Sequence, residues 1–560
     1  MTATRQKMPW HLIFLVLGAL IGPGSVLLSG RDRWDGVIGD YLVQSNKLVG
    51  LGDWLQDSGW WLLWGLMRGL AWLVHHAGFD YWITMKVVIA AIMGWIAWEV
   101  FRLATEVFRF DKVQACWAAA LTLAFPGYVL FQASCHVGVG LFLAFALLGY
   151  RLTLAGGPWR MAMGLVLISL SFQMNSNLLL VPALELARCV IAGRIARRDM
   201  VRIAGLILVS VAGYFLWKLV VGTGGVYSES NYNNIVWPTS WVAIKRLLAS
   251  VVLWASWIPV LLVGPVVWLV LRVGMGCPAT EGLPSAKNQE LPAIRQLLAG
   301  LLLCGAAVAA YVAAGKAAPF FVPTLLGSGG SVYATFAMEF RPGHFFSGIA
   351  SPQIRHTIIL GPVLSITMVA ACIYAAGRFR SARFAPGAAL GVMLAASWLF
   401  MAGWAAWGHH EKLVQGALDQ SVVNALKRLP PPPDGASILI ERHQQQKDWT
   451  GTLETNFMLY EAYGRAAWIA DTVFSPTGPS HAIALALLEE NKAGFLRWAP
   501  KKDIRIFHIA DDFTDSRCTA GYVFELKNPD VVDLLWRMPF APASLAPATL
   551  VNSSRQCPKI

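Results

Sequence analysis

The sequence predicts a polytopic α-helical membrane protein, with about eleven transmembrane helices and a C-terminal soluble α/β domain. Hydrophobic residues occupy 56% of the 560 positions and charged residues only 14%, and the chain contains 25 Trp. The mean hydropathy is +0.53. These values are typical of proteins that cross a membrane several times and exclude an ordinary soluble globular protein.

Apolar runs long enough to cross a bilayer recur from the N-terminus to residue 408. The first run follows a short basic start, is too long for the apolar region of a signal peptide and lacks a small-residue cleavage site, so we expect it to be retained. The expected spans are residues 10–29, 83–103, 114–132, 137–154, 161–175, 177–193, 203–221, 248–272, 296–314, 356–376 and 387–408.

Basic residues are concentrated in every second connection between these runs. The connections around 104–113 and 194–202 carry Lys or Arg, whereas those around 133–136 and 175–177 carry none. By the positive-inside rule, this pattern predicts a cytoplasmic N-terminus and, with an odd number of spans, an outer C-terminus. Segment 59–76 would break the pattern if it crossed the membrane, so we expect it to form an amphipathic helix on the outer surface.

The composition changes after residue 408. We expect a transmembrane domain at 1–408 with its first outer loop at 30–82, a Pro-rich linker at 409–435 and a periplasmic α/β domain at 436–560. In the last domain, ASILIER, WIADTVF, DIRIFHIA and GYVFEL predict strands, and NFMLYEAYGRAA and SHAIALALLEENKAGFLRW predict helices. Cys518 and Cys557 also lie there, where an oxidising compartment would allow a disulfide; two separate thiols are the alternative.

Several function classes lack their sequence motifs. The chain has no CxxC pair, no His/Cys metal spacing, no Walker loop and no GxGxxG. ATP-driven transport and nucleotide-cofactor chemistry therefore have no support. The formal net charge is +13, but the Lys and Arg residues are dispersed between apolar runs, so we expect no nucleic-acid partner.

Polar residues collect in the outer connections. The segment RDRWDGVIGDY, residues 31–41, places Asp32, Asp35 and Asp40 directly behind the first span. The further candidates on this side are His136, Lys218, Tyr227, Glu229, Arg341 and His344. This arrangement favours a membrane-embedded site that opens outward, and the competing interpretation is that charged residues lie in loops because water is there.

The pattern resembles the GT-C superfamily of membrane glycosyltransferases, which use a polyprenyl-phosphate sugar as donor. The resemblance covers the whole chain as architecture, from the early Asp behind the first span to the C-terminal periplasmic domain, and it is specific at RDRWDGVIGDY. In that superfamily the catalytic acid lies in the first outer loop, which implies Asp32, Asp35 or Asp40, and we favour Asp35 in the WDG turn. Many members add a second acidic residue or an adjacent acidic pair. This loop has no such pair and the second loop offers His136, so the need for a divalent metal stays open.

The resemblance implies an integral glycosyltransferase, a hexosyl- or pentosyltransferase of the bacterial inner membrane. It would transfer a sugar from a polyprenyl-phosphate donor to a periplasmic glycan, lipid or protein. A carboxylate such as Asp35 would accept the proton of the attacking hydroxyl. The forked guanidinium of Arg341, with His344 and Lys218, would bind the leaving phosphate.

Each supporting residue has a competing structural role. Arg341 can extend to lipid headgroups instead of binding the donor. His136 can be a structural turn residue, and this role is favoured over a ligand role. Tyr227 and Glu229 would line the acceptor side, but a solvated loop is the better interpretation there.

Rival functions also remain open. A lipid-linked oligosaccharide carrier or flippase would place basic residues along a cavity through the membrane. An O-antigen-type polymerase or ligase shares lipid-linked substrates, but usually lacks a terminal soluble α/β domain. A non-catalytic assembly subunit would tolerate the loss of Asp35.

Overall fold

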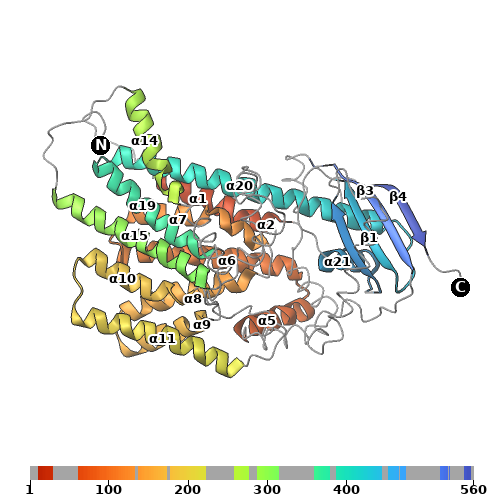
Figure 1. Cartoon of the computed structure of the whole chain (residues 1–560), viewed down its shortest axis with the longest axis horizontal. Coiled ribbons are helices and arrows are strands. Elements are labelled where there is room, and N and C mark those ends of the chain that lie inside the picture. The colour runs from red at the N-terminus through yellow and green to blue at the C-terminus, as the bar shows by residue number, and fades with distance from the viewer. Residues whose placement is uncertain are drawn as a thin grey trace, which may run out of the picture.

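The computed structural model is a mostly helical bundle with a small β-sheet at one end of its long axis (Figure 1). The long helix α20 runs from the bundle to the sheet (Figure 1). The structure describes residues 10–29, 61–132, 136–172, 177–221, 258–275, 287–313, 358–378, 386–443, 452–465, 467–474, 518–527, 529 and 548–556.

Most helices of the bundle share one apolar core. In chain order, the described elements are α1 (Trp10–Ala19), the π-helical turn η1 (Leu20–Gly24), α2 (Ser25–Leu28), α5 (Trp61–Ala77), α6 (Tyr81–Glu106), α7 (Lys112–Leu123), the 3₁₀ helix η2 (Pro126–Gln132), α8 (Val137–Leu154), α9 (Pro158–Ser171), α10 (Leu180–Ala192), α11 (Arg197–Val221), the 3₁₀ helix η5 (Ile258–Leu262), α14 (Val263–Gly274), α15 (Lys287–Ala313), α19 (Leu360–Arg378) and α20 (Pro386–Leu426). The helix expected at 59–76 is present as α5.

Five helices of the described residues are long and apolar enough to cross a membrane, or up to six crossings if one bent pair counts as a span. The five are Trp10–Leu28, Tyr81–Glu106, Val137–Leu154, Leu360–Arg378 and Gly387–Leu426, and the pair is Lys112–Leu123 with Pro126–Gln132. They confirm a helical chain of membrane character, but the expected number of about eleven spans is wrong for these residues.

For several of the expected spans, the reason for the difference is the length of the apolar helix. Helices α9 and α10 contain only 14 and 13 residues, whereas a straight crossing takes about 20. The apolar helices Val260–Gly274 and Leu291–Ala307 are also shorter than the five. A hydropathy window adds apolar residues beyond a helix end to the helix itself, and it therefore overcounts crossings.

The first expected span is a helix interrupted by the π-helical turn η1, which contains Pro23. Proline has no N–H for the regular hydrogen-bond ladder, and π-helical turns are a known way to absorb such an interruption. Gly22 packs against the carbonyl oxygen of Leu123, where a Cβ would have no room. The sequence therefore allows the first helix to lie close against α7 before it ends at Leu28.

The expected span 114–132 is bent. Helix α7 ends at Leu123, and η2 starts at Pro126 with an angle of 50° between the two axes. The residue before a proline avoids the helical conformation, which explains the position of the break. Every residue of η2 is buried, so this turned segment is part of the bundle interior.

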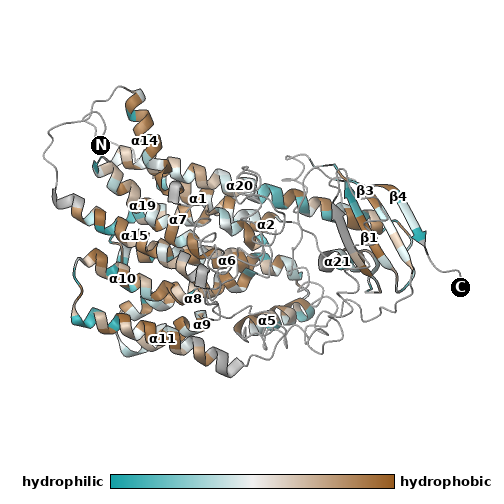
Figure 2. Cartoon of the chain, in the orientation of Figure 1, coloured by the Kyte–Doolittle hydropathy of each residue, from teal (hydrophilic) through white to brown (hydrophobic). Residues whose placement is uncertain are grey.

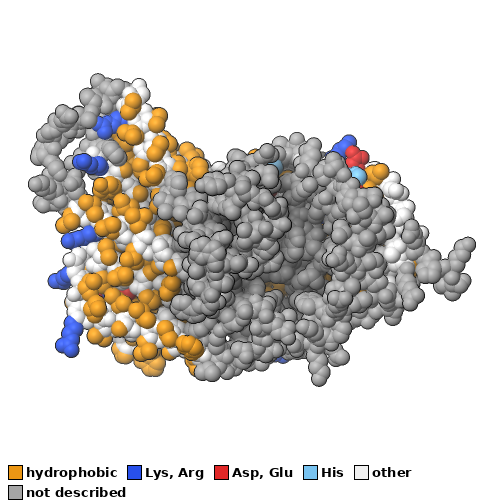
Figure 3. Space-filling model, viewed as in Figure 1, with side chains coloured by type: hydrophobic (Ala, Val, Ile, Leu, Met, Phe, Trp, Pro, Cys, Tyr) orange, Lys and Arg blue, Asp and Glu red, His pale blue; other side chains and the backbone are white. Residues whose placement is uncertain are grey.

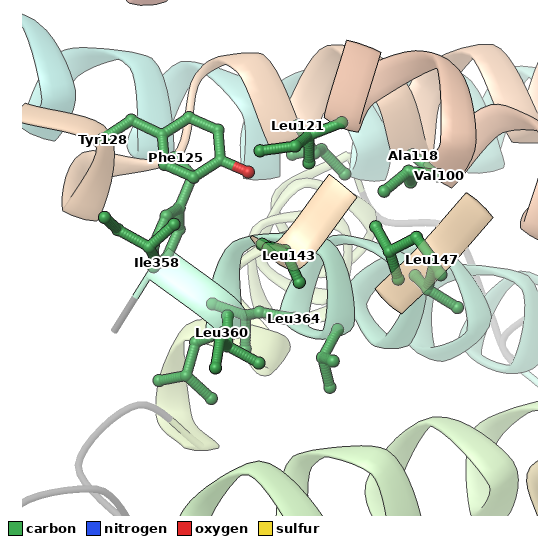
Figure 4. Packing of buried hydrophobic residues seen from close by; sticks show 14 of the residues in the cluster. Val100, Ala118, Leu121, Phe125, Tyr128, Leu143, Leu147, Ile358, Leu360 and Leu364 are labelled. Atoms are coloured by element: carbon green, nitrogen blue, oxygen red, sulfur yellow. The ribbon is translucent and has the colours of Figure 1, made fainter. Parts of the chain in front are cut away.

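The middle of the bundle is tightly packed and apolar. Figure 4 shows side chains such as Leu121, Leu143 and Leu364, which come from different helices and meet in this core. Helices α8 and α9 approach at two glycines: a Cβ on Gly149 would lie 2.8 Å from the carbonyl oxygen of Gly164. Their small size lets the two backbones touch, as is common between helices in membranes.

The C-terminal residues form a four-stranded sheet in the order β2-β1-β3-β4. Strands β1 (Ser437–His443), β2 (Ile469–Phe474) and β3 (Thr519–Glu525) are parallel, and β4 (Thr549–Gln556) pairs antiparallel with β3. With helix α21 (Thr452–Tyr463), they match ASILIER, WIADTVF, GYVFEL and NFMLYEAYGRAA. Strand β4 is an addition, because its polar sequence TLVNSSRQ lacks the alternation of a half-buried strand. SHAIALALLEENKAGFLRW and DIRIFHIA lie outside the described residues.

Helix α20 joins the bundle to the sheet without a break. It continues to Leu426, so the first part of the expected linker 409–435 is helical. Its last turns share an apolar core with the sheet, formed by residues such as Leu418, Val422, Ile438 and Ile440. Apolar residues on this part of α20 are covered by the sheet, which explains why the helix persists beyond the membrane-length run.

Cys518 is disulfide-bonded. The register of β3 and β4 pairs Thr519 with Gln556, the sequence neighbours of Cys518 and Cys557. Cys557 lies outside the described residues. Its pairing with Cys518 therefore stays a prediction, which the register supports.

The two ends of the bundle differ in charge. Hydrophobic residues cover the helices (Figure 2), and Lys and Arg side chains gather at the end opposite the sheet (Figure 3). We call this the basic end; it contains the turns 107–111, 155–157 and 193–196 after α6, α8 and α10. The sheet end contains the end of α2, the end of η2 and the middle of α20.

Candidate functional site

Most of the predicted site residues lie outside the described residues. These are Asp32, Asp35, Asp40, Tyr227, Glu229, Arg341 and His344. Lys218 lies on α11, where its backbone position is described. The side chain of His136 is described, and it lies at the sheet end with residues that the sequence patterns did not single out.

Lys86 lies beside the end of the first helix. It is in the second turn of α6, is only 7% exposed, and donates from Nζ to the carbonyl oxygen of Leu27 at 3.5 Å. The same Nζ lies 5.5 Å from the ring centre of Trp82. The last carbonyls of a helix lack partners within the helix, and a Lys side chain can bind them. An ammonium group therefore lies where the chain leaves α2 and the first outer loop begins.

A buried polar pair faces the same end of the bundle. The amide Nε2 of Gln132, the last residue of η2, lies 2.8 Å from Nδ1 of His409 on α20. Both residues are 2% exposed. Helix α2 contacts both α6 and η2, so the end of the first helix is flanked by the elements that carry Lys86 and Gln132. The bend at Pro126 makes this possible, because it turns η2 away from the axis of α7.

Two buried imidazole nitrogens at this end have no partner among the described residues. They are Nε2 of His409 and Nε2 of His410. Buried polar atoms are nearly always hydrogen-bonded, and one without a partner costs about 1–3 kcal/mol. These two atoms can therefore form hydrogen bonds with a ligand or with water.

His136 immediately precedes α8 and is buried, with 2% of its surface exposed. Its side chain does not cap the helix. It follows Gln132 closely in the chain, so it belongs to the same end of the bundle. The structure thus places His136 inside the packed interior, which agrees with a structural role as well as with a place in the site.

The sheet end of the bundle combines ammonium, imidazole and amide groups. Besides Lys86 and His409, it holds Lys412, which is 7% exposed on the next turn of α20. Donors and positive charges in a region of low dielectric constant attract anions strongly. The described part of the site is therefore suited to hold an anionic group such as a phosphate, and a general base would have to come from another segment.

A second polar cluster lies at the basic end, and its charges are already paired. The carboxylate of Glu185 is fully buried and accepts hydrogen bonds from Tyr150 at 2.9 Å and from Arg188 at 2.7 Å. Arg202 Nε lies 3.1 Å from the same carboxylate. Nearby, Arg151 binds the buried Glu99 at 2.8 Å.

One group of potential metal ligands lies in this second cluster. Ligand atoms of Glu185, Cys189 and Asp199 lie within 4.8 Å of one another. The oxygens of Glu185 are occupied by Tyr150 and two Arg side chains, and a cation would have to compete with these guanidinium groups. The donor set therefore does not fit a metal ion, and the cluster is better described as a network of buried ion pairs.

Some of the residues at the sheet end that the sequence analysis did not select do have a recognisable sequence signal. Lys86 is a charged residue inside the expected span 83–103, where a charge is costly and often functional. His409 and His410 directly follow the expected span 387–408. Gln132 has no such signal, because its importance depends on a contact with a residue far away in the chain.

No protein-family model matches the chain, and no curated protein sequence matches it. The likeness to membrane glycosyltransferases therefore depends on the sequence pattern described above.

Proposed function

We propose that the chain is an integral membrane glycosyltransferase of the bacterial inner membrane. It transfers a sugar from a polyprenyl-phosphate donor to a glycan, lipid or protein on the periplasmic side. The catalytic base is Asp35, with Asp32 and Asp40 as the other candidates in the first outer loop.

The observation that carries this proposal is the position of Lys86 at the end of the first helix. The loop with the three Asp residues starts one residue beyond Ser29, and Lys86 binds the carbonyl of Leu27 just before it. A general base and a phosphate-binding cation have to act on the same donor headgroup, because the base activates the acceptor while the phosphate leaves. A loop that carries three Asp residues and starts close to a buried ammonium group supports this arrangement.

The roles follow from the chemistry. Asp35 accepts the proton of the acceptor hydroxyl as the hydroxyl oxygen attacks the anomeric carbon. The bond between that carbon and the phosphate oxygen breaks, and Lys86 and the imidazole of His409 stabilise the negative charge of the leaving phosphate. Arg341, with His344 and Lys218, adds positive charge on the same face.

The packed interior supports a transferase over a carrier. A carrier needs a polar path across the membrane, but the described helices meet in an apolar core of Leu, Ile, Phe and Ala (Figure 4). Within these helices, buried hydroxyls such as those of Thr122 and Ser365 bond to carbonyls of their own helix.

The test is turnover of a polyprenyl-phosphate sugar by the purified full-length chain. Asp35→Asn should lower turnover by at least about 10²-fold while leaving donor binding and thermal stability unchanged. Asp32→Asn and Asp40→Asn are the matched controls, with the same loss of one carboxylate in the same loop and smaller effects. Lys86→Gln should weaken donor binding more than acceptor binding.

Two outcomes would contradict the proposal. Full turnover in Asp35→Asn alone would transfer the role of base to Asp32 or Asp40. Full turnover in the triple variant would remove the transferase mechanism and favour a carrier or an assembly subunit.

A further inference from the structure

A cluster of exposed arginines lies at the basic end, around the turn between α10 and α11. Arg194, Arg197 and Arg198 are exposed, and the charge of Arg198 helps to lower the pKa of the neighbouring Asp199. Helix α10 ends at Gly193, which has a φ of 69° in the left-handed region. This conformation suits glycine and reverses the chain sharply, so the three guanidinium groups occupy one short turn.

The turn is held in place by buried groups behind it. Asp199 accepts a hydrogen bond from the backbone N–H of Ala196 at 2.8 Å, and it also binds Arg188. Arg188 in turn binds the buried Glu185. Arg202, one turn along α11, donates to the backbone and side-chain oxygens of Thr153 at 3.2 and 2.8 Å. The turn is thus tied to α8, α10 and α11.

These ties leave an excess of positive charge at the surface. The two carboxylates of the network, Glu185 and Asp199, are bound by Arg188 and Arg202. The hydrogen bond from Ala196 and the contact with Arg188 lower the pKa of Asp199, so it stays ionised and keeps its partner. Because these two carboxylates are already paired with Arg188 and Arg202, they offset only part of the positive charge of Arg194, Arg197 and Arg198.

Apolar side chains surround the same turn. Ile195 is 54% exposed and Val201 is 67% exposed, and α9, which packs against α11, carries Trp159, which is 87% exposed. Figure 3 shows Lys and Arg at the edge of a surface that is covered by hydrophobic side chains. A partner for this surface must therefore present an anionic group directly beside a hydrocarbon chain.

We propose that the turn 193–198 is a binding site for an anionic phospholipid. The headgroup phosphate binds Arg194, Arg197 and Arg198, and the acyl chains lie along Ile195, Val201 and Trp159. Guanidinium forks match phosphate oxygens, and basic side chains next to a membrane helix attract anionic lipids. The proposal does not depend on the transferase function, because it concerns the opposite end of the bundle.

The test is lipid binding to the purified full-length chain in detergent, measured by native mass spectrometry with phosphatidylglycerol and with phosphatidylcholine. The triple variant Arg194→Gln/Arg197→Gln/Arg198→Gln should weaken phosphatidylglycerol binding by at least about tenfold. Binding of phosphatidylcholine should not change. The control triple Arg109→Gln/Lys112→Gln/Arg378→Gln removes the same charge from exposed positions outside this turn and should have a much smaller effect.

A second variant distinguishes a specific lipid site, which depends on the geometry of the turn, from non-specific electrostatic attraction of anionic lipids. Asp199→Ala removes a negative charge but also releases the turn from Ala196 and Arg188. If the site is specific, the disordered turn should bind phosphatidylglycerol more weakly. If the attraction is non-specific, the loss of a negative charge should strengthen binding. Equal losses in the two triple variants, or stronger binding in Asp199→Ala, would overturn the proposal. Competition by inorganic phosphate at the same concentration as the lipid would also overturn it, because the acyl chains would then contribute nothing.

Discussion

The side-chain amide of Gln132 lies 2.8 Å from Nδ1 of His409, although 277 positions separate them in the chain. This contact joins the bent segment η2 to the long helix α20 beside the end of the first helix. It fixes one imidazole nitrogen of His409 and leaves the other, Nε2, without a partner in the described residues. The orientation of a ring that we assign to phosphate binding thus depends on a glutamine outside the predicted loops.

Gln132→Ala should therefore reduce both stability and donor binding. It leaves a buried ring nitrogen unpaired, which costs about 1–3 kcal/mol, and it frees the His409 ring to rotate. Thermal unfolding in detergent and donor affinity would be measured together. Gln420→Ala is the control, because Gln420 bonds Glu461 at an exposed position. An equal, small effect of both variants would mean that the Gln132–His409 contact has no special importance.

Gly149→Ala should destabilise the bundle. A Cβ there would lie 2.8 Å from the carbonyl oxygen of Gly164 and 3.0 Å from Ile168, and overpacking of this kind costs about 1–3 kcal/mol. Gly94→Ala on α6 is the control, since nothing lies within 4 Å of its added Cβ. The control should be neutral or gain about 0.5–1 kcal/mol. Unfolding midpoints measured side by side test the difference, and equal midpoints would refute the close approach of α8 and α9.

Arg442→Met should strongly destabilise the junction between α20 and the sheet. Arg442 has a fully buried side chain and binds Asp419 of α20 at 2.7 Å. Loss of one partner of a buried pair costs about 3–5 kcal/mol, because the other charge stays buried without compensation. Limited proteolysis of the sheet region and thermal unfolding would measure the effect.

Two further variants show whether the loss of stability comes from an unpaired buried charge. Arg442→Met/Asp419→Leu should recover part of the loss, because no charge is then left unpaired. Arg465→Met is the exposed comparison: it breaks the pair with Asp434 and should cost no more than about 1 kcal/mol. A stable single variant Arg442→Met would show that α20 and the sheet do not depend on this ion pair.

The orientation of the chain gives the fourth prediction. Basic residues at the turns of one end and the sheet at the other predict that the basic end is cytoplasmic. A reporter that is active only in the periplasm should give signal when it is fused after residue 560 and none when it is fused after residue 196. The reverse pattern would move the proposed catalytic site to the cytoplasmic side.

Local sequence patterns predicted the elements that depend on local composition. Long apolar runs gave the helices near residues 10–28, 81–106, 137–154 and 360–378, and short runs typical of buried strands gave β1, β2 and β3. The number of crossings could not be predicted, because α9 and α10 are helices of only 14 and 13 residues inside longer apolar runs. Strand β4 is polar and pairs only at the edge of the sheet, so a pattern search does not detect it.

The residues of the candidate site also fall into those that the sequence reveals and those that only packing reveals. Asp32, Asp35 and Asp40 stand out in the sequence because charge is unusual directly behind an apolar run, and the position of these side chains lies outside the described residues. Lys86 and His409 carry weaker signals, and Gln132 carries none. The contact of Gln132 with His409 depends on the bend at Pro126, and the contact of Lys86 with Leu27 depends on the packing of α2 against α6.

The sequence by itself determined that the chain is helical and of membrane character, that a small α/β unit follows, and that acidic residues lie behind the first span. Hydropathy and charge act over neighbouring residues, so they can be read along the chain. Only the tertiary structure decided that Gln132 pairs with His409, that Lys86 binds the end of the first helix, and that Arg202 of α11 binds Glu185 of α10. These contacts join residues from different helices, and their energy depends on which helix faces pack together.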